Sequence, residues 1–289
     1  MENSKYKAFL VSAELGSFTK ASKQLNYTPS GVSQLINTLE TELGFPLLIR
    51  NRKGVELTTN GIKILPIIRQ ILKQEDYLKQ VSSEIKGLNT GSVTIAAYSS
   101  ISSHWLPPVI KKFKEKYPNI ELHIMEGIRQ EVNTWLDNNK ADVAFLSYKE
   151  PMLYDWFPLA KDSMLAILPL SHPLSILDAY PIKECQNEQF IMPALGKDDD
   201  VISLLNKHNL SPNIVFSTLE NFATLTLIEQ GLGMSIMNEL ITKRWECNVK
   251  KMPLSPPEYI TLGLAVHSYK KSPPAVKKFI NIASEMLSK

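Results

Sequence analysis

Residues 16–61 constrain the fold of this chain more than any other segment, because they hold two capped helices and a hairpin in close succession. Ser17 is a favoured N-cap residue, and apolar residues follow it at spacings of three and four, which predicts a first helix. Thr28 before Pro29 predicts the start of a second helix, since proline fits the first helical position. The segment Asn26-Tyr27 leaves room only for a tight turn between the two helices.

The second predicted helix has two chemically different faces. Spacings of four, three and four place one apolar set inward, and a glycine ends the helix: Val32, Ile36, Leu39 and Leu43, then Gly44. The start of the helix and its opposite face carry uncharged residues, which we expect to contact DNA: Thr28, Pro29, Ser30, Ser33, Gln34 and Asn37. Gln and Asn can bond adenine at two atoms, and Ser can bond several base edges. On these residues alone, a solvated helical hairpin is the alternative.

A basic hairpin is predicted directly after the helix pair. Two short apolar runs flank a turn that contains Gly54, a pattern typical of a β-hairpin. Arg50, Arg52 and Lys53 cluster at its tip, where they would suit phosphate or minor-groove contact. A basic turn by itself is more often a solvated turn. Beside the two helices, it predicts a winged helix-turn-helix that binds duplex DNA.

This segment resembles the DNA-binding domain of LysR-type transcriptional regulators. The match needs no insertion or deletion. The residues that carry it are Ser17-Phe18, Ala21-Ser22, Leu25, Ser30, Val32-Ser33, Ile36, Leu39-Glu40, Leu43-Gly44, Leu47, Arg50, Arg52, Val55, Leu57-Thr58 and Gly61. Pro29, Ser22 and Leu48 depart from residues that are common in the family. The resemblance implies binding to inverted-repeat DNA as a dimer or a dimer of dimers, and contact with RNA polymerase.

The charge of the chain is unevenly distributed. Residues 1–90 contain 12 Lys and Arg against 8 Asp and Glu, whereas residues 91–289 contain 20 against 21. The basic excess therefore lies with the predicted DNA-binding part, but it is small. We expect tight binding to need two copies of the chain.

A long helix that pairs with a second copy is predicted from Thr58 to about Gly87. Its apolar stripe comprises Ile64, Ile68, Ile71, Leu78 and Ile85. Sustained spacing of three and four over several turns favours helix pairing. A helix packed on its own domain is the alternative, and the resemblance favours a dimer through this linker helix.

From residue 91 onward, apolar strands alternate with helical segments, which predicts an α/β fold with a mostly parallel sheet. The resemblance implies an effector domain of two α/β lobes, similar to a type II periplasmic binding protein, that closes on a small molecule. We therefore expect three parts: a winged helix-turn-helix at 1–58, a linker helix and hinge at 59–90, and an effector domain at 91–289. The two lobes are expected at 91–162 with 267–289, and at 163–266.

The ligand is expected at the carboxyl ends of the strands. Four serines of the loop 99–103 precede or begin a predicted helix, where they could bind an anionic ligand or merely cap the helix. Arg129 could pair with a ligand carboxylate, although a lone Arg after a strand is more often a surface residue. The candidate effector-binding residues are Ser99, Ser100, Ser102, Ser103, Ile128, Arg129, Ser147, Pro193, Leu219 and Glu220.

Other features predict no chemistry. The run from Lys197 to Asp200 lacks the remaining ligands of a calcium loop and predicts a solvated helix start. No metal spacing, nucleophile motif or dinucleotide fingerprint occurs, so we expect no metal, no cofactor and no enzymatic activity. Cys185 and Cys247 are expected to be reduced packing residues, with a redox switch left open by the resemblance. No targeting or membrane segment is evident, which predicts a cytoplasmic protein.

Two hypotheses follow. The first is a LysR-type, ligand-responsive transcription factor. The second is a cytoplasmic small-molecule-binding protein whose N-terminal helices serve only oligomerisation. The absence of a signal peptide and the basic hairpin favour the first.

Overall fold

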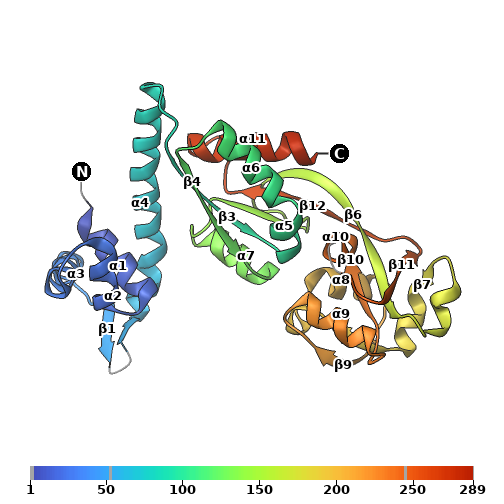
Figure 1. Cartoon of the computed structure of the whole chain (residues 1–289). Helices are drawn as coiled ribbons and strands as arrows, with labels where there is room; N and C mark the ends of the chain where they lie inside the picture. The colour runs from blue at the N-terminus through green and yellow to red at the C-terminus, as the bar shows by residue number, and fades with distance from the viewer. Residues whose placement is uncertain (1–2, 52–53, 244–245, 289) are drawn as a thin grey trace. The chain divides into compact units, whose positions relative to one another are not determined.

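The computed structural model describes residues 3–51, 54–243 and 246–288 (Figure 1). The chain divides into two compact units. The N-terminal unit comprises Met1–Gly91 with Asn138–Lys140, and the C-terminal unit comprises Ser92–Asp137 with Ala141–Lys289. No helix within the described ranges combines the length and apolar composition needed to cross a bilayer.

The N-terminal unit contains four helices and a hairpin among its described residues: α1 (Ser4–Leu15), α2 (Phe18–Leu25), α3 (Pro29–Leu43), β1 (Leu48–Asn51), β2 (Gly54–Leu57) and α4 (Thr59–Ile85). The predicted caps are confirmed, because Ser17 Oγ accepts from Lys20 N and Thr28 Oγ1 accepts from Gly31 N. Gly44 adopts a φ of 81° at the end of α3, a conformation that glycine tolerates without steric cost.

The core of this unit lies among α1, α2, α3 and the start of α4. Val32, Ile36 and Leu39 of α3 are buried in it, as the spacing predicted. The prediction for Leu43 was wrong, because its side chain is 37% exposed at the last turn of α3. Leu43 is the last residue of α3, directly before the C-cap Gly44.

Two close contacts to the backbone of the hairpin segment hold it against the helices. β1 and β2 pair antiparallel, with Arg50 opposite Val55. Gly54 has a φ of 137° and lies so close to Gly16 that a Cβ at position 54 would collide with the Gly16 carbonyl oxygen. From the other side, Glu40 Oε1 accepts hydrogen bonds from the backbone of the β1 entry, 2.6 Å from Leu47 N. Sequence-distant groups therefore fix the hairpin beside α3.

Helix α4 changes character along its length. Leu65 and Ile68 are buried in the core of the N-terminal unit. Further along, Ile71, Leu78 and Ile85 are 38%, 56% and 82% exposed within the described residues. The first part of the helix thus packs on its own unit, whereas the second part presents an apolar seam at intervals of seven residues.

The C-terminal unit is an α/β structure. Its strands are β3 (Gly91–Ala97), β4 (Ile120–Glu126), β5 (Val143–Ser147), β6 (Asp155–Pro169), β7 (Tyr180–Pro181), β8 (Gln189–Met192), β9 (Asn213–Ser217), β10 (Ser235–Asn238), β11 (Val249–Ser255) and β12 (Tyr259–Val266). Its α-helices are α5 (Ser99–His104), α6 (Leu106–Lys116), α7 (Arg129–Asp137), α8 (Asp199–Lys207), α9 (Asn221–Glu229), α10 (Glu239–Thr242) and α11 (Pro274–Leu287). Short 3₁₀ turns lie at Pro173–Ile176, Ile182–Asn187 and Ala194–Gly196.

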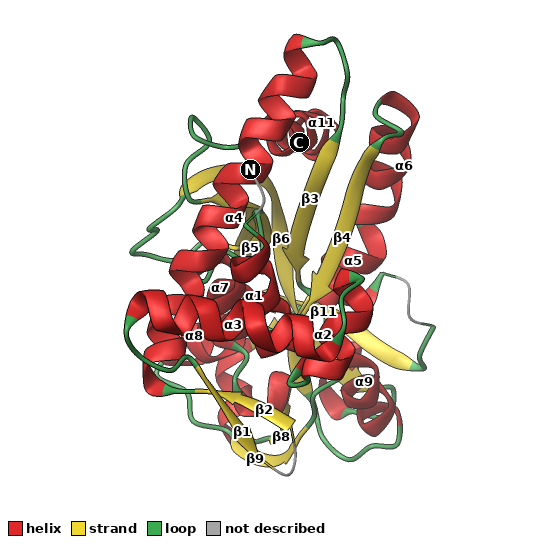
Figure 2. Cartoon of the chain, turned by 90° about the vertical axis from the view of Figure 1, so that its left-hand side faces the viewer, coloured by secondary structure: helices red, strands yellow, loops and turns green. Residues whose placement is uncertain are grey.

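The main sheet has the order β4-β3-β5-β12-β6-β11-β7, with β10 also paired to β6. Strand β4 lies at one edge beside β3, with α6 nearby (Figure 2). Strands β3 and β5 run parallel, but β12 is antiparallel to β5 and β6, and β10 and β11 are antiparallel to β6. The predicted mostly parallel sheet is therefore corrected: the strands that cross between the two halves of the unit introduce antiparallel pairs.

The C-terminal unit has two lobes with separate principal cores. Strand β6 runs through both, since its first part pairs with β12 and its end pairs with β10 and β11 (Figure 1). Leu262, Leu264 and Val266 of β12 are buried in the core of lobe one, whereas Met252 and Leu254 of β11 are buried in the core of lobe two. The expected lobe boundary at residue 266 is thus corrected to the segment before Tyr259, because β12 completes the sheet of lobe one.

The two cysteines lie in different packing environments. Cys185 is buried in the lobe-two core, where its Sγ lies 3.8 Å from Met234 Sδ. Burial raises the pKa of the Cys185 thiol to about 12, which disfavours the reactive thiolate. Cys247 is half-buried and packs against another cluster. Both contacts are those of packing residues.

Candidate DNA-recognition face and effector cavity

The N-terminal part of α3 presents the polar face that the sequence predicted. Gln34 and Asn37 are exposed, one turn apart, and their side-chain amides make no hydrogen bond to other described residues. Exposed groups at the start of the helix are already partly engaged, since Thr28 Oγ1 lies 3.0 Å from Ser30 Oγ while it caps Gly31. Pro29 is exposed at the first helical position. The two amides are thus the uncommitted hydrogen-bonding groups of this face.

Arg50 is held against the same helix. Its guanidinium donates to Ser33 Oγ and lies 4.5 Å from the centre of the Phe18 ring. Ser33 is therefore half-buried and engaged by Arg50 rather than free beside Gln34. Stacking on an aromatic ring fixes a planar guanidinium while leaving its other donors open. Arg52 and Lys53, the other predicted basic contacts, lie outside the described residues.

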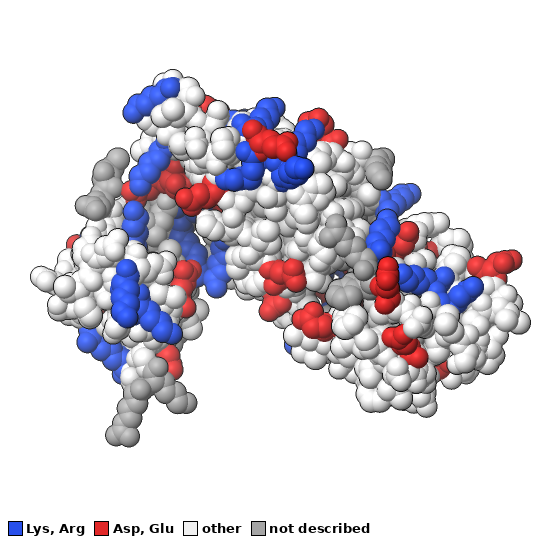
Figure 3. Space-filling view, in the orientation of Figure 1, with Lys and Arg blue, Asp and Glu red and all other residues white. Residues whose placement is uncertain are grey.

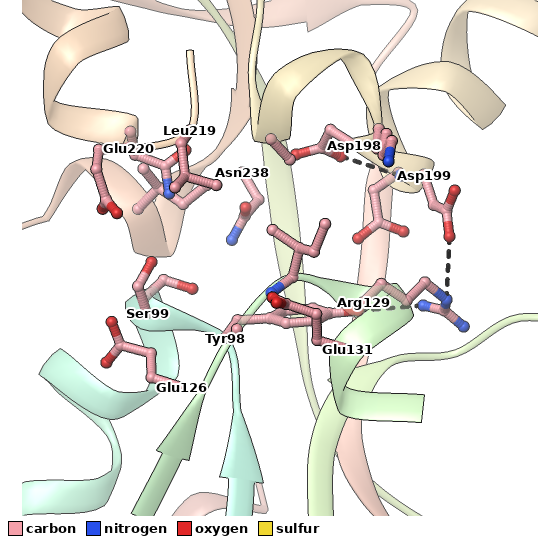
Figure 4. A pocket seen from close by; sticks show the side chains of 18 residues that line it. Tyr98, Ser99, Glu126, Arg129, Glu131, Asp198, Asp199, Leu219, Glu220 and Asn238 are labelled. Carbon is pink, nitrogen blue, oxygen red and sulfur yellow. Dashed lines mark hydrogen bonds and ion pairs between the residues drawn. The ribbon is translucent and has the colours of Figure 1, made fainter. Parts of the chain in front are cut away.

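A cavity of about 310 Å³ lies between the two lobes of the C-terminal unit (Figure 4). Its size falls within the range of small-molecule sites. The residues that line it come from both lobes: Tyr98, Ser99, Ser100, Glu126, Gly127, Ile128, Arg129, Glu131, Ala194, Lys197, Asp198, Asp199, Asp200, Leu219, Glu220, Asn221, Asn238 and Ile241. Helices α5, α7, α8 and α9 all begin at this cavity.

Six of the ten predicted effector-binding residues line the cavity: Ser99, Ser100, Ile128, Arg129, Leu219 and Glu220. Ser102, Ser103, Ser147 and Pro193 are not part of its lining. Ser103 faces back along α5, where its Oγ donates to the Ser99 carbonyl at 2.7 Å. The expectation that a serine side chain caps this helix is corrected, since Tyr98 occupies the N-cap position and no side chain caps it.

Ser147 is fully buried and does not line the cavity, but it contacts residues that do. Arg129 Nη1 donates to Ser147 Oγ at 2.6 Å and to the Ser147 carbonyl at 2.8 Å. The same Ser147 hydroxyl lies 2.8 Å from each carboxylate oxygen of Asp200, to which it donates. Because Ser147 belongs to lobe one and Asp200 to lobe two, this hydroxyl connects the lobes.

Two cations strengthen the connection between the lobes. Arg129 Nε lies 3.6 Å from Asp199 Oδ2. Lys149 Nζ donates to Ser203 Oγ at 2.9 Å and lies 3.7 Å from Asp200 Oδ1. Burial lowers the pKa of Lys149, and the neighbouring carboxylate of Asp200 opposes that shift. The two lobes are thus joined through charged groups at one side of the cavity.

The acidic run of α8 was misjudged from the sequence. Asp198 is the N-cap of α8, as a helix start requires, and its Oδ1 accepts from Asp200 N and Val201 N. It is not a solvated turn, however, because it lines the cavity between the lobes, where its carboxylate is turned to the start of its own helix (Figure 4). Burial raises the pKa of Asp198 to about 6. The sequence contains the acidic run, but it does not indicate which part of the fold lies on the other side of the cavity.

Twelve of the 18 lining residues were not among the predicted ones, and Tyr98 and Asn238 are two of them. Tyr98 is half-buried at the end of β3, and burial together with Asp200 raises the pKa of its phenol to about 12. Asn238 lies at the end of β10, and its Nδ2 donates to Asp162. Each follows directly from a strand, so the rule that ligands lie beyond strand ends could have found them.

Comparison with known proteins identifies both units. Residues 4–62 match the model of the bacterial regulatory helix-turn-helix protein, lysR family, and residues 86–288 match the LysR substrate binding domain. The chain belongs to the LysR family of transcription regulators. LysR-family regulators bind DNA and respond to effectors, which decides between the two hypotheses in favour of the transcription factor.

Similar proteins span the whole chain. The uncharacterized HTH-type transcriptional regulator YvbU of Bacillus subtilis is 34% identical over 283 residues, which cover 97% of each chain. The structure of full-length CbnR complexed with target DNA has a TM-score of 0.68 and 20% identity, covering 99% of both chains. The effector binding domain of QuiR in complex with shikimate has a TM-score of 0.62 and 22% identity, covering 69% of this chain and 98% of that one. These structures share the fold.

Proposed function

We propose that this LysR-family regulator recognises the bases of an inverted-repeat operator with α3 and changes its DNA binding when a small molecule occupies the cavity between its lobes. The exposed, uncommitted amides of Gln34 and Asn37 are the observation that carries the DNA part. Amides at this spacing on one helix face can bond successive base edges in the major groove.

The groups around these amides suit the DNA backbone. Thr28, Pro29 and Ser30 lie at the N-terminus of α3, where a phosphate is favoured by the helix dipole. Arg50 is fixed beside them by Phe18, and we propose that it contacts a phosphate. Ser33 then acts by positioning Arg50. For Arg52 and Lys53, phosphate contact remains a proposal from the sequence.

We propose that two copies pair through the exposed part of α4. Ile71, Leu78 and Ile85 recur at seven-residue intervals and are exposed. A heptad seam of this kind is buried when two helices pair. Pairing would supply the second recognition helix that an inverted repeat needs.

The effector part rests on the cavity and on the charged groups that connect the lobes. A ligand that binds one arrangement of the lobes better than another shifts the population of that arrangement. We propose that this shift alters the spacing of the two recognition helices and, as the family resemblance implies, access of RNA polymerase. The proposed role is regulatory, includes no catalysed reaction and places the protein in the cytoplasm with the chromosome.

The test compares two glutamine variants of the full chain by fluorescence anisotropy. The DNA is a duplex that the protein selects from random sequence, and a scrambled duplex measures non-specific binding. Gln34→Ala should weaken binding to the selected duplex by about 1–3 kcal/mol and leave the scrambled duplex nearly unchanged. Gln70→Ala, at an exposed position on α4, is the matched control and should change neither. Equal losses on both duplexes would contradict base recognition by Gln34.

A salt series on the same duplexes separates backbone contact from base contact. The logarithm of affinity should fall linearly with the logarithm of salt concentration, because phosphate binding releases counterions. Arg50→Ala should reduce that slope by about 1 per monomer. An affinity that does not depend on salt would contradict the proposed function.

A further inference from the structure

The cavity between the lobes is strongly acidic. Among the described residues, six Asp and Glu side chains line it, against one Arg and one Lys, which leaves a formal charge of −4. Acidic side chains also gather where the two lobes meet on the face shown in Figure 3. The N-termini of α5, α7, α8 and α9 add roughly half a positive charge each, or about +2 in all. The side chains therefore outweigh the helix ends, and the cavity is negative.

The polar groups of the cavity are mostly hydrogen-bond acceptors. Asp198 and Glu131 already accept backbone donors at the starts of α8 and α7. Asn238 is an exception, because one N–H of its Nδ2 donates to Asp162 and the amide keeps a second donor as well as its acceptor oxygen. Glu126 and Glu220 are exposed side chains that face each other from opposite lobes (Figure 4). A ligand that complements such walls must supply donors.

The protein itself shows that this junction accepts an organic cation. Arg129, whose side chain is only 10% exposed, lies at one side of the cavity between lobe one and Asp199 of lobe two. Its guanidinium is satisfied on the lobe-one side by Ser147 and the Tyr98 hydroxyl. The distance from Arg129 Nε to Asp199 Oδ2 is 3.6 Å, and the Asp199 side chain is 49% exposed, so this ion pair remains partly open to solvent. The occupied side of the junction thus holds a planar cation among oxygen atoms of both lobes.

The same geometry argues against other ligand classes. No group of three or more His, Cys, Asp and Glu is placed to hold a metal ion among the described residues. The carboxylates are spread around the cavity, which suits an extended organic cation with several N–H donors. An anionic ligand, which the serine loop had suggested, would meet the carboxylates of Glu126 and Glu220 beside Ser99 (Figure 4).

We propose that the effector of this regulator is a small organic cation that carries a primary ammonium or guanidinium group, bound between Glu126 of lobe one and Glu220 of lobe two. The proposal rests on the proposed function, since it names the ligand class of the same cavity. A carboxylate from each lobe gives the cation a direct means to hold the lobes together. The cationic group takes the end of the cavity that Arg129 leaves open.

The test measures thermal unfolding and calorimetric binding of the full chain with defined probes. The cations are 1,4-diaminobutane, agmatine and arginine, and the anions are succinate and shikimate. The cations should raise the melting temperature and bind, whereas the anions should do neither. The double variant Glu126→Gln and Glu220→Gln should lose roughly tenfold or more in affinity, since each exposed ion pair accounts for up to about fivefold. Glu115→Gln, at an exposed position on α6, should bind as the unaltered chain does.

Three results would overturn the ligand class: no binding by any of the cations, binding by the anions instead, or cation affinity unchanged in the double variant. None of them affects the proposed function, which the anisotropy experiment tests without any ligand. If the chain binds DNA specifically and no cation binds, the proposed DNA-binding function is retained and the proposed cationic ligand class is refuted. If specific DNA binding fails, the proposed function fails whatever the cations do.

Discussion

Replacing Asp198 with asparagine should stabilise the C-terminal unit at alkaline pH and not at acid pH. The cause is the burial that raises the pKa of Asp198 from 3.8 to about 6. The folded state therefore binds the proton of the Asp198 carboxyl group more tightly than the unfolded state does. Stability that depends on Asp198 is greatest below about pH 4 and falls as the pH rises towards about 6, because the buried carboxylate must then be ionised.

The magnitude follows from the two pKa values. A rise from 3.8 to about 6 corresponds to about 3 kcal/mol of unfolding free energy once the carboxylate is fully ionised. Asparagine keeps an oxygen that can accept from Asp200 N and Val201 N, and it is itself a good N-cap. The pKa of about 6 is a net value, because it already includes the stabilisation of the carboxylate by the backbone N–H groups of Val201 and Asp200. We therefore expect Asp198→Asn to gain up to about 3 kcal/mol at about pH 8 and close to nothing at about pH 4.

Tryptophan fluorescence during urea unfolding of the full chain measures this effect. All four tryptophans of the sequence, at positions 105, 135, 156 and 245, come after Gly91, so the signal reports the C-terminal part of the chain. Asp178→Asn is the control, since Asp178 is an exposed aspartate of lobe two. Destabilisation of the Asp198 variant by the same amount at both pH values would refute the argument that burial of its charge opposes folding.

Three further changes test other parts of the molecule. Leu78→Asp should dissociate the dimer in sedimentation experiments, because it places a charge in the exposed seam of α4; an unchanged sedimentation coefficient would remove α4 from the interface. Asp200→Ala should lower the stability of the C-terminal unit by about 1–3 kcal/mol in the same urea assay, because Ser147 loses its acceptor, and a smaller change would mean that water replaces it. Gly54→Ala should lower the melting temperature of the N-terminal unit, because a Cβ would strike the Gly16 carbonyl, and an unchanged melting curve would show that the hairpin moves freely away.

The N-terminal unit was readily predicted because its signals are local. Caps at Ser17 and Thr28 and the glycine at the end of α3 act on the backbone within a few residues, and the structure has each of them. The exposure of Leu43 was not predictable in the same way, since it depends on what packs over the last turn of α3. Apolar spacing identifies the inward face of a helix but not the point at which the core ends.

The C-terminal unit was predicted less completely because its site depends on contacts between distant segments. Apolar runs located most strands, but the alternating pattern does not encode which strand pairs with which, so the antiparallel pairing of β6 and β12 was missed. Ser147 was expected in the ligand site, yet its partner Asp200 lies 53 residues away and holds it behind the wall. Likewise, the sequence predicted that a helix starts at the acidic run of α8. It did not predict that this helix start lines a cavity, because the cavity forms only where the two lobes meet.

The central claim is that this chain recognises a specific operator and that a ligand in its cavity changes that recognition. The most direct measurement is a footprint of the full chain on the DNA upstream of its own coding sequence, with and without 1,4-diaminobutane. We expect a protected inverted repeat with half-sites about one helical turn, roughly 10 base pairs, or a multiple of that apart. We also expect the pattern of protection to change when the cation is added. Uniform cleavage along the whole fragment, with no protected site in either condition, would contradict the central claim.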